Sequence, residues 1–102
     1  MKDSKKKPKK GQKKSPSIPI MLGELQNQID QTRSEDEKGR TLLRGLTSDI
    51  KEYLEGFAKG EKRAKESFLQ RLRDAVDHFA VTHPTLTLAL SYALTILSTA
   101  GI

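Results

Sequence analysis

With 102 residues and no cysteine, the chain is long enough for one domain, and both a disulfide framework and a cysteine-based metal site are excluded. The net charge of +6 is unevenly distributed: residues 1–14 carry eight lysines and one aspartate, a sum of +7, and residues 15–102 carry eleven Lys/Arg against twelve Asp/Glu, a sum of −1. The body is therefore almost neutral, and the positive charge belongs to an N-terminal arm.

Residues 1–17 form this lysine-rich arm. They contain no apolar residue after Met1, so they cannot bury enough surface to offset the entropy of ordering, and they are predicted to be disordered. Lysines attract phosphate, so the arm is a candidate contact for nucleic acid or anionic lipid, with a solubilising tail as the alternative. Without aromatic or arginine side chains, the arm is not expected to read base sequence. The candidate phosphate-contacting residues are Lys2, Lys5, Lys6, Lys7, Lys9, Lys10, Lys13 and Lys14.

A helical domain is predicted over residues 18–102, and its first helix is expected over 18–32. Ser17 can cap the start of this helix, and Pro19 suits a first turn because the missing N–H costs nothing there. The apolar residues follow the 4-3-4 spacing of one helical face. They are Ile18, Leu22, Leu25 and Ile29.

The second helix is expected over residues 35–57. Ser34 followed by Glu37 has the spacing of a capping box. Gly45 lies inside this helix, at a cost of about 1 kcal/mol relative to alanine, and is interpreted as a point of close approach by the first helix. Gly56 and Gly60 predict the following turn. A wide apolar stripe, typical of a bundle face, runs through Leu42, Leu43, Leu46, Ile50, Tyr53, Leu54 and Phe57.

The third and fourth helices are expected over residues 61–81 and 84–100. A residue before proline is disfavoured in the α region, so the third helix should end ahead of Pro84, which then begins the fourth. Gly101 is a stop signal. The fourth helix has two apolar stripes. One contains Leu86, Leu90, Ala93, Leu94 and Leu97, and the other contains Leu88, Tyr92 and Ile96.

These elements predict an all-α bundle of four helices with a C-terminal helical hairpin. The segment from His83 to Ile102 has no charged residue, which indicates either a helix buried in the protein or one that also contacts a membrane surface. The buried helix is the better interpretation, since the apolar core from Leu86 to Leu97 has only twelve residues. The stripe of Leu88, Tyr92 and Ile96 is then left for self-association, and a dimer or higher oligomer is predicted.

Chemistry-bearing residues are sparse. Asp74, Asp77 and His78 share one helical face and His83 follows, but two histidines across a helix end are a weak metal pattern. His83 is interpreted as a capping or turn residue ahead of Pro84. The hydroxyl groups of Ser91, Thr95 and Ser98 are expected to bond to the preceding helical turn. No catalytic, cofactor-binding or metal-binding residue is predicted, and the chain is not expected to be an enzyme.

The C-terminal sequence LQRLRDAVDHFAVTHPTLTLALSYALTILSTAGI, with its His83-Pro84 step and Gly-Ile end, resembles a family of short bacterial all-helical proteins catalogued only as a domain of unknown function. The resemblance extends back through LLRGLTSDIKEYLEG and LGELQNQIDQ, and so covers about Leu22 to Ile102. It implies a small helical protein without an assigned activity, cofactor or catalytic residue. Members of this family place charges in the last helix, and this chain has none there.

Three functions are therefore open. The first is a non-enzymatic interaction or assembly module. The second is an adaptor that binds nucleic acid non-specifically through the lysine-rich arm. The third is a peripheral membrane protein that uses the arm and the uncharged last helix. No apolar run follows the lysines as it would in a secretory signal, so the expected location is the cytoplasm, with peripheral membrane contact as the variant.

Overall fold

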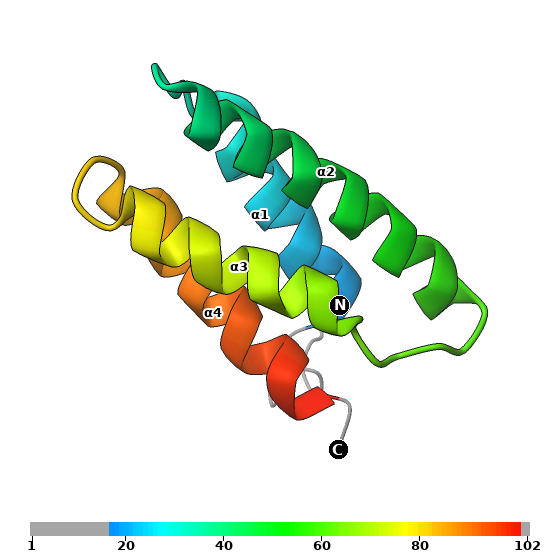
Figure 1. Cartoon of the computed structure of the whole chain (residues 1–102). Helices are drawn as coiled ribbons and strands as arrows, with labels where there is room; N and C mark the ends of the chain where they lie inside the picture. The colour runs from blue at the N-terminus through cyan, green and yellow to red at the C-terminus, as the bar shows by residue number, and fades with distance from the viewer. Residues whose placement is uncertain (1–16, 101–102) are drawn as a thin grey trace, which may run out of the picture.

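Four helices joined by short connections make up the computed structural model, which describes residues 17–100 (Figure 1). Each helix runs antiparallel to the one before it, and α4 packs against α1 to close the ring. This is the up-down-up-down arrangement of a four-helix bundle, and it confirms the all-α prediction. The helices are α1 (Ile18–Gln31), α2 (Glu37–Ala58), α3 (Glu66–Phe79) and α4 (Pro84–Ala100).

The core consists of the apolar stripes of the four helices. Every helix contributes a leucine whose side chain has no exposed surface: Leu22, Leu46, Leu72 and Leu90. Full burial of a leucine side chain contributes roughly 1.5–3 kcal/mol. Among residues 17–100, no buried side chain is charged, and the core depends mainly on shape and apolar area, with the hydroxyl of buried Tyr53 satisfied by a hydrogen bond. The remaining buried side chains include Leu25, Ile29, Ile50, Phe68, Ala75, Phe79, Leu86, Ala93 and Leu97.

The helix starts agree only in part with the sequence prediction. Ser17 is at the N-cap position of α1 and a proline lies in the first turn, as predicted, but the side chain of Ser17 makes no capping hydrogen bond. The capping box of Ser34 and Glu37 is wrong: Asp36 is the N-cap of α2, and the hydroxyl of Ser34 donates to Oδ1 of Asp36 at 2.7 Å. With Asp36 as its N-cap, α2 begins at Glu37, two residues later than expected.

The turn after α2 lies where its glycines predicted it. The N–H of Glu61 donates to the carbonyl of Gly56 at 2.9 Å, and the N–H of Gly60 donates to the carbonyl of Phe57 at 3.0 Å. These two bonds form a Schellman motif, which satisfies carbonyls left free at the helix end. Gly60 has φ +96°, a conformation that side-chain-bearing residues rarely adopt.

The third helix is shorter at both ends than predicted. It starts at Glu66 rather than residue 61. The segment before it is attached to α2 by the hydroxyl of Tyr53, which donates to the carbonyl of Lys62 at 2.6 Å. The other end lies at Phe79 rather than residue 81. As predicted, Pro84 then begins α4.

Gly45 is close to α3 and not to α1. A Cβ atom placed at Gly45 would lie 2.5 Å from Nε and 2.8 Å from Cδ of Arg71. The guanidinium of Arg71 pairs with Asp49 and also donates to the carbonyl of Gly45 at 3.4 Å. The interpretation of Gly45 as a point of approach by the first helix is therefore wrong: the missing side chain makes room for an arginine of α3.

Candidate functional site

The most exposed apolar surface of α4 is the side that faces away from the core. Leu88 is 72% exposed and Tyr92 is 50% exposed, and Ile96 is partly buried where it packs against the core. Since these residues are spaced by four, they follow one another by about one turn along the helix. We call this surface the α4 outer face; it contains Leu88, Tyr92 and Ile96 together with the exposed threonines Thr85, Thr95 and Thr99.

The opposite side of α4 lies in the core. Leu86 and Leu97 are each 2% exposed, and Leu90 has no exposed surface. The prediction of a buried last helix is therefore confirmed. The two stripes predicted in α4 separate as expected, one facing the bundle and the other, the α4 outer face, lying largely in solvent.

The outer faces of the other helices differ in chemistry. They carry exposed ionised side chains such as Glu24 on α1, Lys51 and Glu55 on α2, and Asp77 on α3. No side chain described on α4 is ionised at neutral pH. Because water solvates charges strongly, a surface without charges loses the least hydration free energy when a partner covers it.

The residues considered for a metal site are not brought together. His78 Nε2 lies 2.8 Å from Oδ2 of Asp36, and His83 Nε2 lies 3.1 Å from the carbonyl oxygen of Arg33. Asp74 accepts a hydrogen bond from Gln70 at 3.1 Å. Within residues 17–100, no group of three or more potential ligands is placed to hold a metal ion.

Both histidines instead connect the α3–α4 hairpin to the α1–α2 hairpin. They come from α3 and the connection that follows it, and their partners lie in the connection between α1 and α2. The ring of Phe79 lies edge-on to both imidazole rings, with centroids 4.9 Å from His78 and 5.3 Å from His83. The interpretation of His83 as a capping or turn residue agrees with its position: its carbonyl accepts the N–H of Thr87 at 2.9 Å in the first turn of α4.

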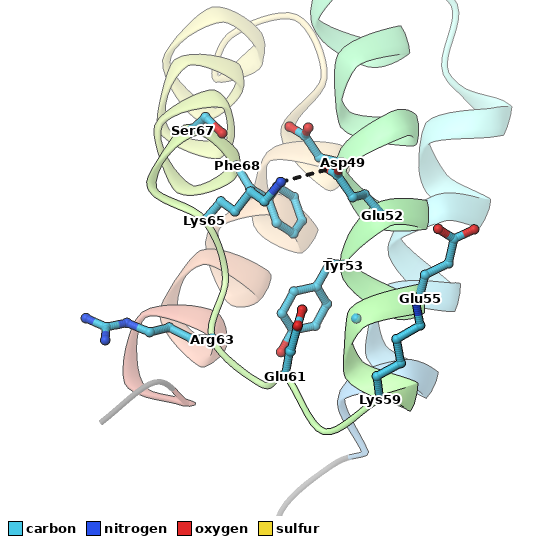
Figure 2. Close-up of a pocket in the computed structure, with 11 residues that line it drawn as sticks. Asp49, Glu52, Tyr53, Glu55, Lys59, Glu61, Arg63, Lys65, Ser67 and Phe68 are labelled. Atoms are coloured by element: carbon cyan, nitrogen blue, oxygen red, sulfur yellow. Dashed lines mark ion pairs between the residues drawn. The ribbon is translucent and has the colours of Figure 1, made fainter.

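A pocket of about 260 Å³ lies at the opposite end of the bundle, between the last turns of α2, the 59–65 connection and the start of α3 (Figure 2). Tyr53 and Phe68 lie in its wall, 6.1 Å apart between ring centroids. The Nζ of Lys65 pairs with Oε2 of Glu52 at 3.3 Å across its edge. Burial raises the pKa of Tyr53, whose hydroxyl donates to a backbone carbonyl.

This pocket was not predicted from the sequence. It depends on the non-helical path of residues 61–65, whereas the sequence pattern predicted that these residues belong to the third helix. The pocket mixes carboxylates and cations, so its surface favours no single charge on a ligand. The acidic residues are Asp49, Glu52, Glu55 and Glu61, and the basic residues are Lys59, Arg63 and Lys65.

The predicted phosphate-contacting arm, with its eight lysines, lies outside residues 17–100, and its role stays a prediction. The part of the chain that the structure describes contains no helix with the length and apolar content needed to cross a membrane.

The fold defines a small antiparallel four-helix bundle, and among the residues that the structure describes its last helix presents an outer face without charged side chains. The chain belongs to the family described as Domain of unknown function (DUF4404), whose model matches residues 18–102. The resemblance seen in the sequence is thereby confirmed, and the match begins four residues earlier than Leu22. Neither the curated proteins nor the solved structures gave a match.

Proposed function

We propose that this protein is a non-enzymatic interaction module, and that the α4 outer face is its binding surface. The observation that carries the proposal is the 72% exposure of Leu88 on a helix that has no charged side chain. Covering a leucine that is largely in water is worth roughly 1.5–2 kcal/mol, and no ionised group would lose its hydration on this face.

The chemistry of the face defines the kind of partner. An apolar and hydroxyl-bearing helix surface best matches another protein surface that is uncharged and apolar, because a charged partner would bury its ions without a counter-charge. Such a face alone is small. A helix of 17 residues is roughly 25 Å long, so we expect an interface below the roughly 800 Å² per partner of stable complexes, and a reversible association.

The test is capture with a tagged protein in which one residue is changed. Leu88→Glu places a charge on the face, whereas Ser48→Glu places the same charge at an exposed position of α2 and is the matched control. We expect the wild type and Ser48→Glu to retain a protein, either another chain or untagged copies of itself, and Leu88→Glu to lose it. Retention that is equal for both variants contradicts the proposal.

A second role is proposed for the arm on the basis of charge segregation alone. Residues 1–14 carry +7 on a body of −1, a distribution that suits a non-specific contact with the phosphates of nucleic acid or anionic lipid. Deletion of residues 1–14 should abolish gel-shift affinity at low salt, or sedimentation with anionic vesicles, and leave the helical content unchanged. If binding survives the deletion, the arm is not responsible for it.

A further inference from the structure

We infer that the partner of the α4 outer face is the same face of a second copy, arranged antiparallel around a two-fold axis at Tyr92. This inference rests on the proposed function and adds the partner and its orientation. The geometry of the face is the first support. Leu88 and Ile96 lie four residues before and after Tyr92, so a two-fold rotation about an axis through Tyr92 brings Leu88 opposite the partner's Ile96. The same rotation brings the two Tyr92 rings together, an offset contact that tyrosine pairs favour.

Charge is the second support. In an isologous interface each residue near the axis meets its own copy, so any charged residue there would meet a like charge. Glu24, Lys51 and Asp77 show that the outer faces of α1, α2 and α3 carry such residues. The α4 outer face has no ionised side chain, and it is therefore the helix face of residues 17–100 that can contact itself without electrostatic cost.

The position of the arm favours the antiparallel orientation. Gln28 and Thr32, at the end of α1, line the same hollow as Pro84 and Leu86, at the start of α4. Because α1 and α4 are antiparallel, the start of α1, and with it Ser17, lies near the end of α4 (Figure 1). A parallel pair of α4 helices would attach both +7 arms at one end. An antiparallel pair attaches them at opposite ends, separated along the pair by roughly the 25 Å length of α4, so that the two arms repel each other less. The helix dipoles of the two α4 helices also oppose each other in the antiparallel arrangement.

The chain contains no cysteine, so introduced thiols can report the register. In the proposed dimer the two copies of position 92 face each other, within the Cα separation of roughly 4.4–6.8 Å that a disulfide needs. The two copies of position 88 lie roughly 12 Å apart, since each is displaced about 6 Å from the axis in opposite directions. Position 88 faces position 96 of the partner.

The experiment compares disulfide formation in full-length single-cysteine variants under mild oxidation. We expect Tyr92→Cys to link to itself, and Leu88→Cys and Ile96→Cys to link to themselves at least roughly ten-fold more slowly. A mixture of Leu88→Cys with Ile96→Cys should form the mixed dimer at a rate close to that of Tyr92→Cys. Ser48→Cys on α2 gives the rate of random collision.

Sedimentation of the cysteine-free wild type provides the independent measurement. We expect a dimer that dissociates on dilution through the micromolar range, and a loss of at least roughly ten-fold in dimer affinity for Leu88→Glu but not for Ser48→Glu. Rapid self-linking of Leu88→Cys would overturn the antiparallel orientation. An 11.4 kDa species at all concentrations would overturn the second copy as partner.

The two proposals fail in different ways. If the wild type stays monomeric but captures another chain through Leu88, the interaction module stands and the second copy is rejected as its partner. If it stays monomeric and sediments with anionic vesicles in a manner that depends on Leu88, the occupant of the face is lipid and both proposals for the α4 outer face are wrong.

Discussion

Leu88 and Leu90 lie two residues apart on α4 and face opposite surroundings. Leu90 has no exposed surface, whereas Leu88 is 72% exposed. Successive helical positions are separated by about 100°, so two positions are enough to move a side chain from the core to the solvent. The same amino acid therefore has a structural role at one position and a proposed binding role at the other.

The first prediction follows from this difference. Leu90→Ala should lower the free energy of unfolding by roughly 2–5 kcal/mol, because it removes buried methyl groups and leaves a cavity. Leu88→Ala should change it by less than about 0.5 kcal/mol when the protein is dilute enough to be monomeric. Urea denaturation followed by circular dichroism measures both. Equal losses for the two variants would mean that Leu88 is not on an exposed face.

A second prediction concerns Gly45. Alanine at this position gains about 1 kcal/mol of helix propensity, but its Cβ would lie 2.5 Å from Nε of Arg71. The arginine would have to move away from Asp49, so we expect Gly45→Ala to stabilise the wild type by less than about 0.5 kcal/mol. In an Arg71→Ala background the same change should gain the full amount of about 1 kcal/mol. A double-mutant cycle in urea tests this, and identical effects in the two backgrounds would contradict it.

At the scale of the element, the ends of the helices depend on backbone hydrogen bonds more than on side-chain caps. The N-cap residues Ser17, Asp36 and Lys65 make no side-chain capping bond. By contrast, α2 ends in the Schellman motif at Gly60. The C-terminal end of α2 is therefore fixed by specific capping hydrogen bonds, which the N-terminal ends of α1, α2 and α3 do not have from their N-cap side chains.

The third prediction compares two exposed glycines. Gly60→Ala should destabilise the fold by roughly 1–3 kcal/mol, since the residue has φ +96°. Gly23→Ala should stabilise it by about 0.5–1 kcal/mol, because Gly23 lies inside α1 and an added Cβ meets nothing within 4 Å. Thermal denaturation of both variants shows the sign directly. Stabilisation by Gly60→Ala would contradict the description of this turn.

At the scale of the whole molecule, two contacts connect the α1–α2 hairpin to the α3–α4 hairpin at the end distant from the arm. Asp36 pairs with His78, and the carbonyl of Arg33 contacts His83. The hydrogen bond from Ser34 holds the pKa of Asp36 below its ordinary value of 3.8, and the neighbouring His78 lowers it further. The ionised form of Asp36 is thus preferred in the folded chain.

The fourth prediction is a dependence of stability on pH. A carboxyl group whose pKa is lowered by folding stabilises the folded state above its unfolded pKa, and that contribution disappears as pH falls through the folded pKa. Asp36→Asn should therefore be less stable than the wild type at about pH 6, and the difference should disappear as the pH falls below 3.8 and through the lowered pKa of Asp36. Denaturation across this range measures it. A difference that persists at the acid end would show that the charge of Asp36 is not its source.

The sequence by itself determined the class of the fold, the number of helices and which side of α4 is buried. Those properties depend on apolar residues three and four positions apart, and this spacing is a local property that any helix expresses in the same way. The stripe with Leu86, Leu90 and Leu97 and the stripe with Leu88 and Tyr92 were separable for that reason.

Only the tertiary structure decided where α3 begins, why residue 45 is a glycine, and which groups the two histidines contact. Each of these depends on a contact between different segments: Tyr53 with Lys62, Arg71 with Gly45, and His83 with Arg33 fifty residues earlier. Helical periodicity gives the face on which a residue lies but not the register of one helix against the next. That register is set by the packing of the whole core, and the pocket between α2 and α3 exists only because of it.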